Sequence, residues 1–234
     1  MIKHKSSTHP PKQDRGDATR EKLLTSSIDV FGRYGFDGAT TRMLAEAAGV
    51  NLQAIPYYFG GKEGLYIAAA EHLASIIIGH VAELRNTIIE RLGRLDSAGE
   101  ALSPDEARTI LTQLAQHMVG LFVSRQSESW ARFIIREQME PTEAFERIYG
   151  SVMAPMIGTA GRLVATILNE PTQSDHVRLR TLSFVGSILV FRMANAAVLR
   201  QMGWQAVGPD ELDILRRHAA GLVAALGGDK EARS

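Results

Sequence analysis

The chain has 234 residues, 45% hydrophobic and 22% charged, so it can bury a core and is not disordered as a whole. Its 26 basic and 26 acidic residues cancel, so any charge that attracts nucleic acid has to be local. The absence of cysteine excludes disulfides and thiolate chemistry. The chain lacks a run of about 18 uninterrupted apolar residues and an N-terminal secretory segment, so we expect a soluble cytoplasmic protein with no membrane partner.

The N-terminal region, residues 1–16, is polar and carries two consecutive prolines that oppose a helix. We predict a flexible basic arm, which either reaches DNA phosphates or is a solvated tail without a role. The first helix is predicted from Asp17, as its N-cap, to Tyr34, with Gly35 ending it. Its buried stripe is expected to consist of Leu24, Ile28 and Phe31.

The segment TTRMLAEAAGVNLQAIPYYFGGK, residues 40–62, has the pattern of two short helices joined by a tight turn. Thr40 or Thr41 is expected to cap the first helix, and Gly49 to adopt the left-handed conformation after its last turn. Asn51 is expected to cap the second helix, whose inner face would carry Ile55 and Phe59. This pattern predicts a helix-turn-helix at about residues 40–59, whose second helix enters a DNA major groove. The alternative is a helical corner that binds nothing.

Four stretches of the chain resemble the TetR family of bacterial transcriptional regulators: Phe31-Gly-Arg-Tyr-Gly35-Phe36, Thr40-Thr41, Ala45-Glu-Ala-Ala-Gly49-Val50, and Tyr57-Tyr58-Phe59-Gly-Gly-Lys62-Glu63-Gly-Leu65. The resemblance covers about residues 17–77. A later run is more loosely similar to the CecR-like subgroup of the family: Arg136-Glu137-Gln-Met-Glu-Pro141-Thr142. The resemblance implies an all-α homodimer. In it, N-terminal three-helix, homeodomain-like units bind a palindromic DNA operator, and a larger C-terminal helical domain binds a small-molecule inducer and dimerises.

The physical roles of the helix-turn-helix residues follow from their chemistry. Gln53 can pair with adenine, a contact that contributes about 1–3 kcal/mol of discrimination, and Leu52 and Ala54 can touch thymine methyls. Hydroxyl groups and Arg42 suit phosphates, as does Lys62 together with free amides at a helix N-terminus. Arg42 could instead be solvated, and Tyr58 could belong to the core. The predicted DNA-binding residues are Thr40, Thr41, Arg42, Asn51, Leu52, Gln53, Ala54, Tyr57, Tyr58 and Lys62.

Pro56 departs from the family pattern, which usually has a tyrosine at that position. A proline has no N–H and crowds the carbonyl of Leu52, so we expect the recognition helix to be kinked or to begin differently. Tyr57 could replace the tyrosine contact with phosphate. The exact register of the base contacts is therefore left open.

The fourth helix is predicted from Lys62 for more than six turns of about 3.6 residues each, followed by a linker over residues 96–102. The C-terminal domain is predicted over residues 78–228, followed by a disordered tail at residues 229–234. Within it, caps are expected at Ser103 and Thr142, and a proline is expected to break or kink a helix near residues 151–154.

The segment from about residue 173 to 202 is predicted as one helix, apolar nearly all round between Leu182 and Leu199. A helix that is apolar on every side has to be buried on every side. Together with the last helix, which follows Pro209, it would form a four-helix bundle with the same helices of a second copy. The alternative is a larger monomeric core.

A ligand cavity is expected among the middle helices, but the sequence defines it poorly. Arg192 needs a partner if it is buried, either a ligand carboxylate or Glu137. The predicted ligand-binding residues are His117, Met118, Phe122, Trp130, Phe133, Glu137, Met153, Arg192 and Asn195. We expect no cofactor and, because the seven histidines are scattered, no metal site.

Three classes of function remain after this reading. The first is a repressor that binds DNA as a dimer and is released by a small-molecule inducer. The second is a DNA-binding protein of the same fold that recruits a protein partner without a small effector. The third, a helical enzyme, has no support from a phosphate-binding loop, a nucleophile elbow or a zinc-binding helix.

Overall fold

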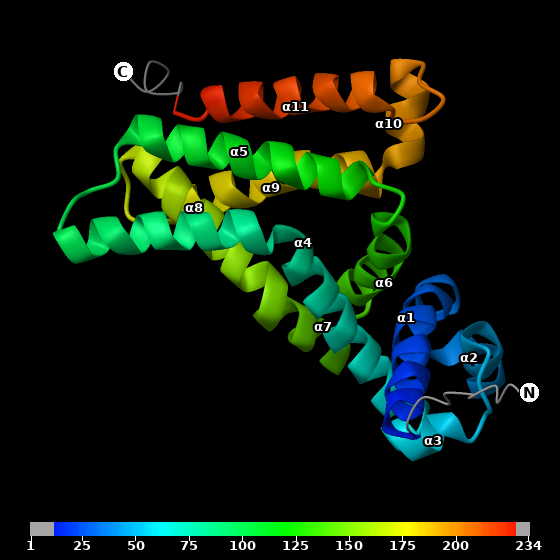
Figure 1. Cartoon of the computed structure of the whole chain (residues 1–234). Coiled ribbons are helices and arrows are strands. Elements are labelled where there is room, and N and C mark those ends of the chain that lie inside the picture. The colour runs from blue at the N-terminus through cyan, green and yellow to red at the C-terminus, as the bar shows by residue number, and fades with distance from the viewer. Residues whose placement is uncertain (1–11, 228–234) are drawn as a thin grey trace, which may run out of the picture.

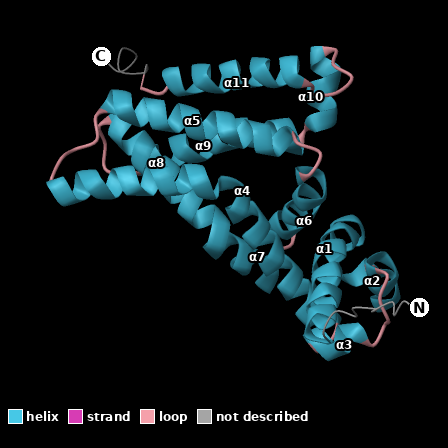
Figure 2. Cartoon of the chain, viewed as in Figure 1, coloured by secondary structure: helices cyan, strands magenta, loops and turns pink. Residues whose placement is uncertain are grey.

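The computed structural model describes residues 12–227, and helices dominate it, with no strand in that range (Figures 1 and 2). The helices are α1 (Lys12–Gly38), α2 (Thr41–Ala48), α3 (Ala54–Phe59), α4 (Lys62–Ala98), α5 (Pro104–Val123), α6 (Ser127–Met139), α7 (Glu143–Ile148), a π-helical turn (Tyr149–Met153), α8 (Ala154–Leu168), α9 (Asp175–Met193), α10 (Asn195–Met202) and α11 (Pro209–Ala224). The predicted all-α class is confirmed.

The first helix is longer than expected. It begins at Lys12 rather than at Asp17, because the Lys, Gln and Arg residues before Asp17 favour a helix and Gly16 costs only about 1 kcal/mol there. The predicted arm therefore lies outside the described residues up to position 11, and its last residues belong to α1. Gly35 interrupts the helical conformation at φ 72° and ψ 178°, and one further turn follows it.

Two hydrophobic cores share α4. The first joins α1, α2 and α3 to the part of α4 up to Ile77, and it includes Leu24, Ile28, Phe31, Leu44 and Ile55. The second begins at Val81 and joins the rest of α4 to α5, α8, α9 and α11. The predicted domain boundary after residue 77 lies between these two residues. Helices α6 and α7 nevertheless pack into the first core, through residues such as Trp130 and Phe133.

Helix ends follow local sequence in most places. Ser103 caps α5 by accepting the N–H of Glu106 at 3.2 Å, and Thr142 caps α7 by accepting the N–H of Ala144 at 3.1 Å. The predicted linker is shorter than expected, because α4 continues to Ala98 and ends at Gly99, whose φ is 67°.

Pro155 does not break its helix. The five residues before Ala154 form the π-helical turn. The helical path therefore runs from α7 into α8 through this wider turn without a break. A proline removes an i to i−4 hydrogen bond, and a π turn is one way to pass that position without ending the helix.

The segment predicted as one helix over residues 173–202 is two helices. α9 and α10 meet at Ala194 with a bend of 80°, so α10 stands across the end of the bundle between α9 and α11 (Figure 1). By length and composition alone, α4 and the continuous segment of α7 and α8 are apolar enough to cross a membrane, although 44% of the most apolar stretch of each is buried within the protein.

Candidate DNA-binding interface and effector site

Two local hydrogen bonds and one backbone conformation fix the corner between α2 and α3. The Thr40 hydroxyl accepts the N–H of Met43 at 3.2 Å, which caps α2 as predicted. Gly49 ends α2 with φ 63°, a conformation that glycine adopts without strain. The Asn51 carboxamide oxygen accepts the N–H of Gln53 at 2.9 Å, and this bond starts the turn that leads into α3. Interactions between residues close together in the sequence therefore hold the corner in place.

Helix α3 presents one face to solvent and buries the other. Ile55 is fully buried, whereas Tyr57 is 80% exposed, and Leu52, in the turn before the helix, is 45% exposed. Gln53 is exposed beside them, and Ala54 is half-buried against the core. An aromatic ring exposed to this extent contributes little to the core, so this face is available for binding.

Pro56 is the third residue of α3, where a helix has no internal use for its N–H. The Leu52 carbonyl accepts the N–H of Ile55 at 3.3 Å, and the Gln53 carbonyl accepts the N–H of Tyr57 at 3.2 Å. The proline therefore leaves neither carbonyl unpaired, and α3 begins at Ala54 after a turn rather than being kinked.

Two predicted phosphate contacts have other partners. The Lys62 ammonium donates to the carbonyls of Phe36 and Ala39 at 2.9 and 3.1 Å, and it lies 4.3 Å from the Phe36 ring centroid. It therefore holds the end of α1. Arg42 is exposed and donates to Glu46 at 2.9 Å. An exposed ion pair of this kind is weak, so Arg42 remains available to a phosphate.

Helix α1 adds residues that the sequence analysis missed. Thr19 and Lys22 line a shallow open hollow together with residues of the α2–α3 corner, among them Gln53, Tyr57 and Tyr58. Arg20 lies near them, with its guanidinium carbon 5.6 Å from the Phe59 ring centroid. The only sequence signal for this part of α1 was its basic character.

The predicted ligand-binding residues do not converge on one cavity. Trp130 and Phe133 belong to the first core, and Met118 to the second. His117 is exposed and its ring nitrogen lies 3.0 Å from the His80 carbonyl. The remaining members also bond within the protein: the Met153 sulfur accepts from Gln138, Asn195 donates to the Phe191 carbonyl, and the Phe122 carbonyl accepts from Arg192.

Of the two partners considered for Arg192, a ligand carboxylate or Glu137, the structure does not pair it with Glu137. Arg192 donates to the backbone carbonyls of Phe122 and, at 2.6 Å, Ser124, at the C-terminal end of α5. Burial lowers the pKa of the Arg192 guanidinium from its ordinary value, and the nearby Glu128 partly opposes that effect. Glu137 is buried elsewhere, in α6, with partners of its own.

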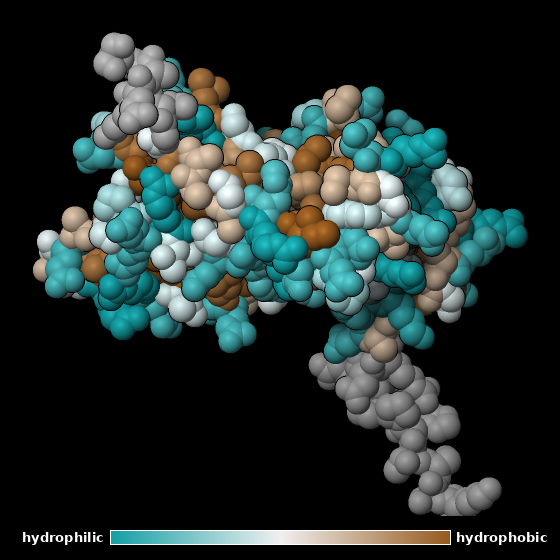
Figure 3. All heavy atoms as spheres, turned by 90° about the horizontal axis from the view of Figure 1, so that it is seen from above, coloured by the Kyte–Doolittle hydropathy of each residue, from teal (hydrophilic) through white to brown (hydrophobic). Residues whose placement is uncertain are grey.

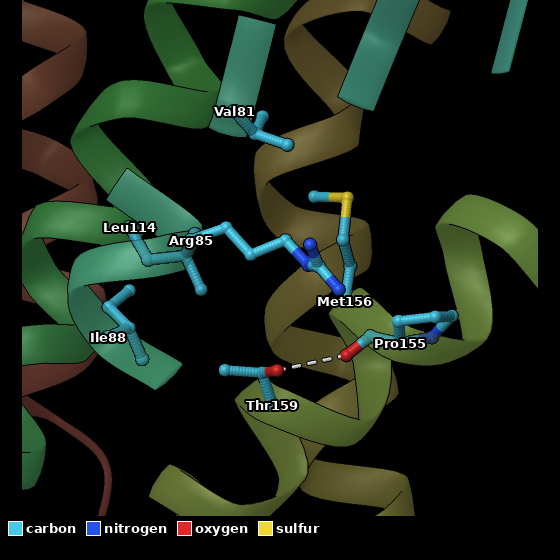
Figure 4. A pocket seen from close by; sticks show the side chains of 7 residues that line it. All are labelled: Val81, Arg85, Ile88, Leu114, Pro155, Met156 and Thr159. Atoms are coloured by element: carbon cyan, nitrogen blue, oxygen red, sulfur yellow. Dashed lines mark hydrogen bonds between the residues drawn. The ribbon is translucent and has the colours of Figure 1, made fainter. Parts of the chain in front are cut away.

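A small hollow lies between α4, α5 and α8 and contains none of the predicted ligand residues. Its lining is Val81, Arg85, Ile88, Leu114, Pro155, Met156 and Thr159. Figure 4 shows the Arg85 side chain extending across it towards Met156 and Pro155. The Thr159 hydroxyl donates to the Pro155 carbonyl at 3.0 Å. The volume of the hollow is only about 30 Å³, which is room for about two waters.

Helix α9 exposes an apolar stripe that no other segment within residues 12–227 covers. Four large apolar side chains at helical spacing are 40 to 64% exposed: Leu179, Leu182, Val190 and Met193. The opposite face of α9 is buried in the second core. Brown apolar residues also interrupt the polar surface seen from above (Figure 3). No group of three or more histidine or acidic side chains with metal-binding geometry occurs among residues 12–227.

Comparison with known proteins identifies two regions. Residues 23–69 match the family described as bacterial regulatory proteins, tetR family, and residues 107–228 match the C-terminal domain of the HTH-type transcriptional dual regulator CecR. The chain is 30% identical to CecR of Shigella flexneri over 211 residues, which cover 89% of this chain and 91% of that protein.

Solved structures share the fold. A TetR-family regulator from Mesorhizobium loti aligns with a TM-score of 0.59 at 18% identity, over 91% of this chain and 96% of that one. AibR in complex with isovaleryl coenzyme A and operator DNA aligns with a TM-score of 0.58 at 13% identity, over 87% of this chain and 97% of that one.

Proposed function

The chain belongs to the TetR family of bacterial transcriptional regulators and is a DNA-binding regulator, not an enzyme; from this premise we propose that it is a cytoplasmic repressor that binds a palindromic operator as a homodimer and is released by a small-molecule effector. The observation that carries this proposal is the exposed face of α3, where Gln53 and Tyr57 project from a corner fixed by Thr40, Gly49 and Asn51.

Base recognition is assigned to Gln53, Leu52 and Ala54, and phosphate contact to Thr40, Thr41, Arg42, Asn51, Tyr57 and Tyr58, to which we add Thr19 and Lys22. Lys62 is assigned a role in holding α1 and only a secondary contact with phosphate.

The second copy is expected on the apolar stripe of α9, together with α11. Large exposed side chains of this kind mark interaction surfaces in soluble proteins. A symmetric dimer would cover the stripe with the same stripe and would set two recognition helices on one face of the DNA.

The effector is assigned to the hollow between α4, α5 and α8. A lining of apolar side chains with one cation and one hydroxyl suits an organic anion with an apolar body, which Arg85 would bind through its charge. In AibR the bound molecule is an acyl coenzyme A. Because little space is open here, an effector has to move α8 away from α4, and the π-helical turn beside Pro155 is the irregular segment where such a movement can occur.

Selection of bound duplexes from random DNA by the full chain tests the main proposal. We expect a palindromic consensus whose binding weakens steeply as salt rises. Gln53→Ala should lower the preference for one base position by about tenfold, within the range for one specific contact, while Gln113→Ala on the exposed side of α5 should leave it unchanged. Enrichment of no sequence would contradict DNA recognition.

A panel of aliphatic and aromatic carboxylates, each beside its neutral alcohol, tests the effector class. A carboxylate that raises the melting temperature and releases the selected DNA should lose both effects with Arg85→Gln, and the alcohol should have neither effect. If no member of the panel releases DNA from the wild-type chain, the alternative of a regulator that recruits a protein partner is favoured, since the closed hollow agrees with it.

A further inference from the structure

Glu137 is a buried acid that the proposed DNA and effector sites do not use. It lies in α6 and is only 2% exposed. One carboxylate oxygen accepts the hydroxyl of Tyr66, and the other accepts the N–H and the hydroxyl of Thr142, at 3.1 and 2.9 Å. A buried carboxylate with three donors is fully satisfied, so it can stabilise a specific arrangement of the helices that carry those donors.

The three donors come from two residues that lie far apart in the chain. Tyr66 lies in the first turns of α4, directly after the helix-turn-helix, and Thr142 is the N-cap of α7. The Tyr66 ring contacts Phe31 and Phe36 of α1, with centroids 4.7 and 5.3 Å away, and it stacks on Phe133 of α6 at 5.0 Å. Glu137 thus joins the DNA-binding unit to α6 and α7 through a single carboxylate.

Helices α1 and α6 also approach closely on the same side. A side chain at Gly32 would lie 3.2 Å from the backbone oxygen of Ser129, and a side chain at Gly35 would lie 2.8 Å from the guanidinium of Arg136. Asp29 and Arg132 form an ion pair at 3.6 Å across the same contact. The DNA-binding unit therefore rests on α6 along much of that helix.

The other end of α6 is tied to the helix with the exposed apolar stripe. Arg192 of α9 donates to the carbonyls of Phe122 and Ser124, directly before α6 begins at Ser127. The Ser127 hydroxyl donates back to the same two carbonyls, at 2.9 and 3.0 Å. One short helix of 13 residues thus connects α9 to the DNA-binding unit with polar contacts at both ends.

We propose that α6 sets the angle between the DNA-binding unit and α9. Glu137 and Tyr66 are then positioning residues for operator recognition, because their hydrogen bond fixes the C-terminal end of α6. The segment Arg136-Glu137…Pro141-Thr142 then serves to fix this angle. In a dimer through α9, this angle decides which spacing of DNA half-sites the two recognition helices fit. That last step rests on the proposed dimer, but the angle within one chain does not.

Spin labels can measure the angle within one chain. The protein has no cysteine, so Ala47→Cys on α2 and Gln113→Cys on α5, both exposed, give two labels on opposite sides of the connection. Labelled chains are mixed with an excess of unlabelled chains, so that distances between subunits do not contribute. We expect a narrow distance distribution for the otherwise unchanged chain. Tyr66→Phe and Glu137→Gln should broaden it or add a second distance.

Tyr34→Phe is the matched control, because it removes a tyrosine hydroxyl from α1 at a side chain that is 52% exposed. It should leave the distance distribution unchanged. The melting temperature is recorded for each variant, so that a folded chain with a changed distance is distinguished from an unfolded one.

The DNA measurement uses the duplex selected by the wild-type chain and the same duplex with two base pairs added between its half-sites. We expect Tyr66→Phe to reduce the preference for the selected spacing by about tenfold, the effect of losing about 1.4 kcal/mol. Binding to a single half-site should remain unchanged, because Tyr66 does not lie on the exposed face of α3.

The proposal is overturned if both variants keep the narrow distance and the spacing preference, whether or not their melting temperature falls. In that case the hydrogen bonds of Glu137 with Tyr66 and Thr142 only stabilise the fold. If the chain proves monomeric or selects no DNA, the proposed function fails, and the distance measurement still decides whether Glu137 and Tyr66 hold the angle.

Discussion

At the scale of residues, local sequence predicted the caps correctly but not the partners of long charged side chains. Thr40, Ser103 and Thr142 cap the helices that follow them, because each bond reaches only two or three residues along the chain. Lys62 instead reaches carbonyls 23 and 26 residues away. No pattern in the sequence indicates such a contact, so its predicted role in phosphate binding was incomplete.

Lys62→Met should lower the free energy of unfolding by about 1–2 kcal/mol, since two half-buried carbonyls would lose a charged donor. Urea unfolding followed by circular dichroism measures this change. Lys22→Met removes an equivalent charge from the exposed surface of α1 and should leave the stability unchanged while weakening binding to DNA of any sequence. Equal stability of the two variants would contradict the structural role of Lys62.

The environment of Tyr66 predicts that the protein loses stability in alkaline solution. Burial raises the pKa of its hydroxyl above the ordinary value of 10.0, and the hydrogen bond to Glu137 and the Glu137 charge raise it further, partly opposed by Arg136. Because the folded-state pKa is raised, the unfolded chain loses this proton first. The contribution of protonated Tyr66 to the free energy of unfolding is therefore complete below about pH 10 and is lost as the pH rises above it.

The measurable consequence is a difference between two unfolding curves. Between about pH 9 and about pH 11, the wild-type chain should lose more stability than Tyr66→Phe, whereas Tyr34→Phe should follow the wild type. Parallel curves for the wild type and Tyr66→Phe would show that Tyr66 does not titrate in this way.

At the scale of elements, the sequence predicted where helices begin more reliably than how long they run. The helix-turn-helix, the start of α4 and the start of α11 follow local signals. The extension of α1 to Lys12, the π-helical turn and the bend at Ala194 do not. The extension of α1 is compatible with the helix propensity of residues 12–15 but has no cap that marks its start, and the other two features lie where distant helices pack together. Gly35 is an exception, because its predicted break coincides with a conformation that few residues other than glycine adopt.

Gly35→Ala should destabilise the chain by about 1–3 kcal/mol, because an alanine is strained at φ 72° and its side chain would meet the Arg136 guanidinium. Gly38→Ala is the control: a side chain there would meet its nearest neighbour at 3.5 Å, an ordinary contact, and the stability should stay the same or rise slightly. Thermal unfolding of the two variants side by side measures the difference.

At the scale of the whole molecule, the described part of one chain leaves the apolar stripe of α9 exposed. The sequence predicted that this segment needs burial on all sides, and the structure buries only Phe184, Ile188, Phe191 and their neighbours. The side that remains exposed is the surface expected to receive a second copy.

Leu182→Glu should convert the proposed dimer into a monomer at micromolar concentration, since it places a charge in the middle of an apolar interface. Sedimentation velocity measures the mass in solution. Ile89→Glu, at an apolar side chain of α4 that is 45% exposed, should leave the mass unchanged. A wild-type chain that sediments as a monomer would contradict the dimer.

The sequence by itself determined the helical class, the helix-turn-helix with its caps, and the family, because each is recorded in contacts between residues close along the chain or in motifs at fixed spacing. The tertiary structure alone decided that Lys62 holds α1, that Arg192 and Glu137 stand apart, and that the hollow is lined by Arg85 rather than by the predicted residues. The physical reason is that a long or buried polar side chain takes its partner from whatever the packing of distant helices brings within hydrogen-bond distance.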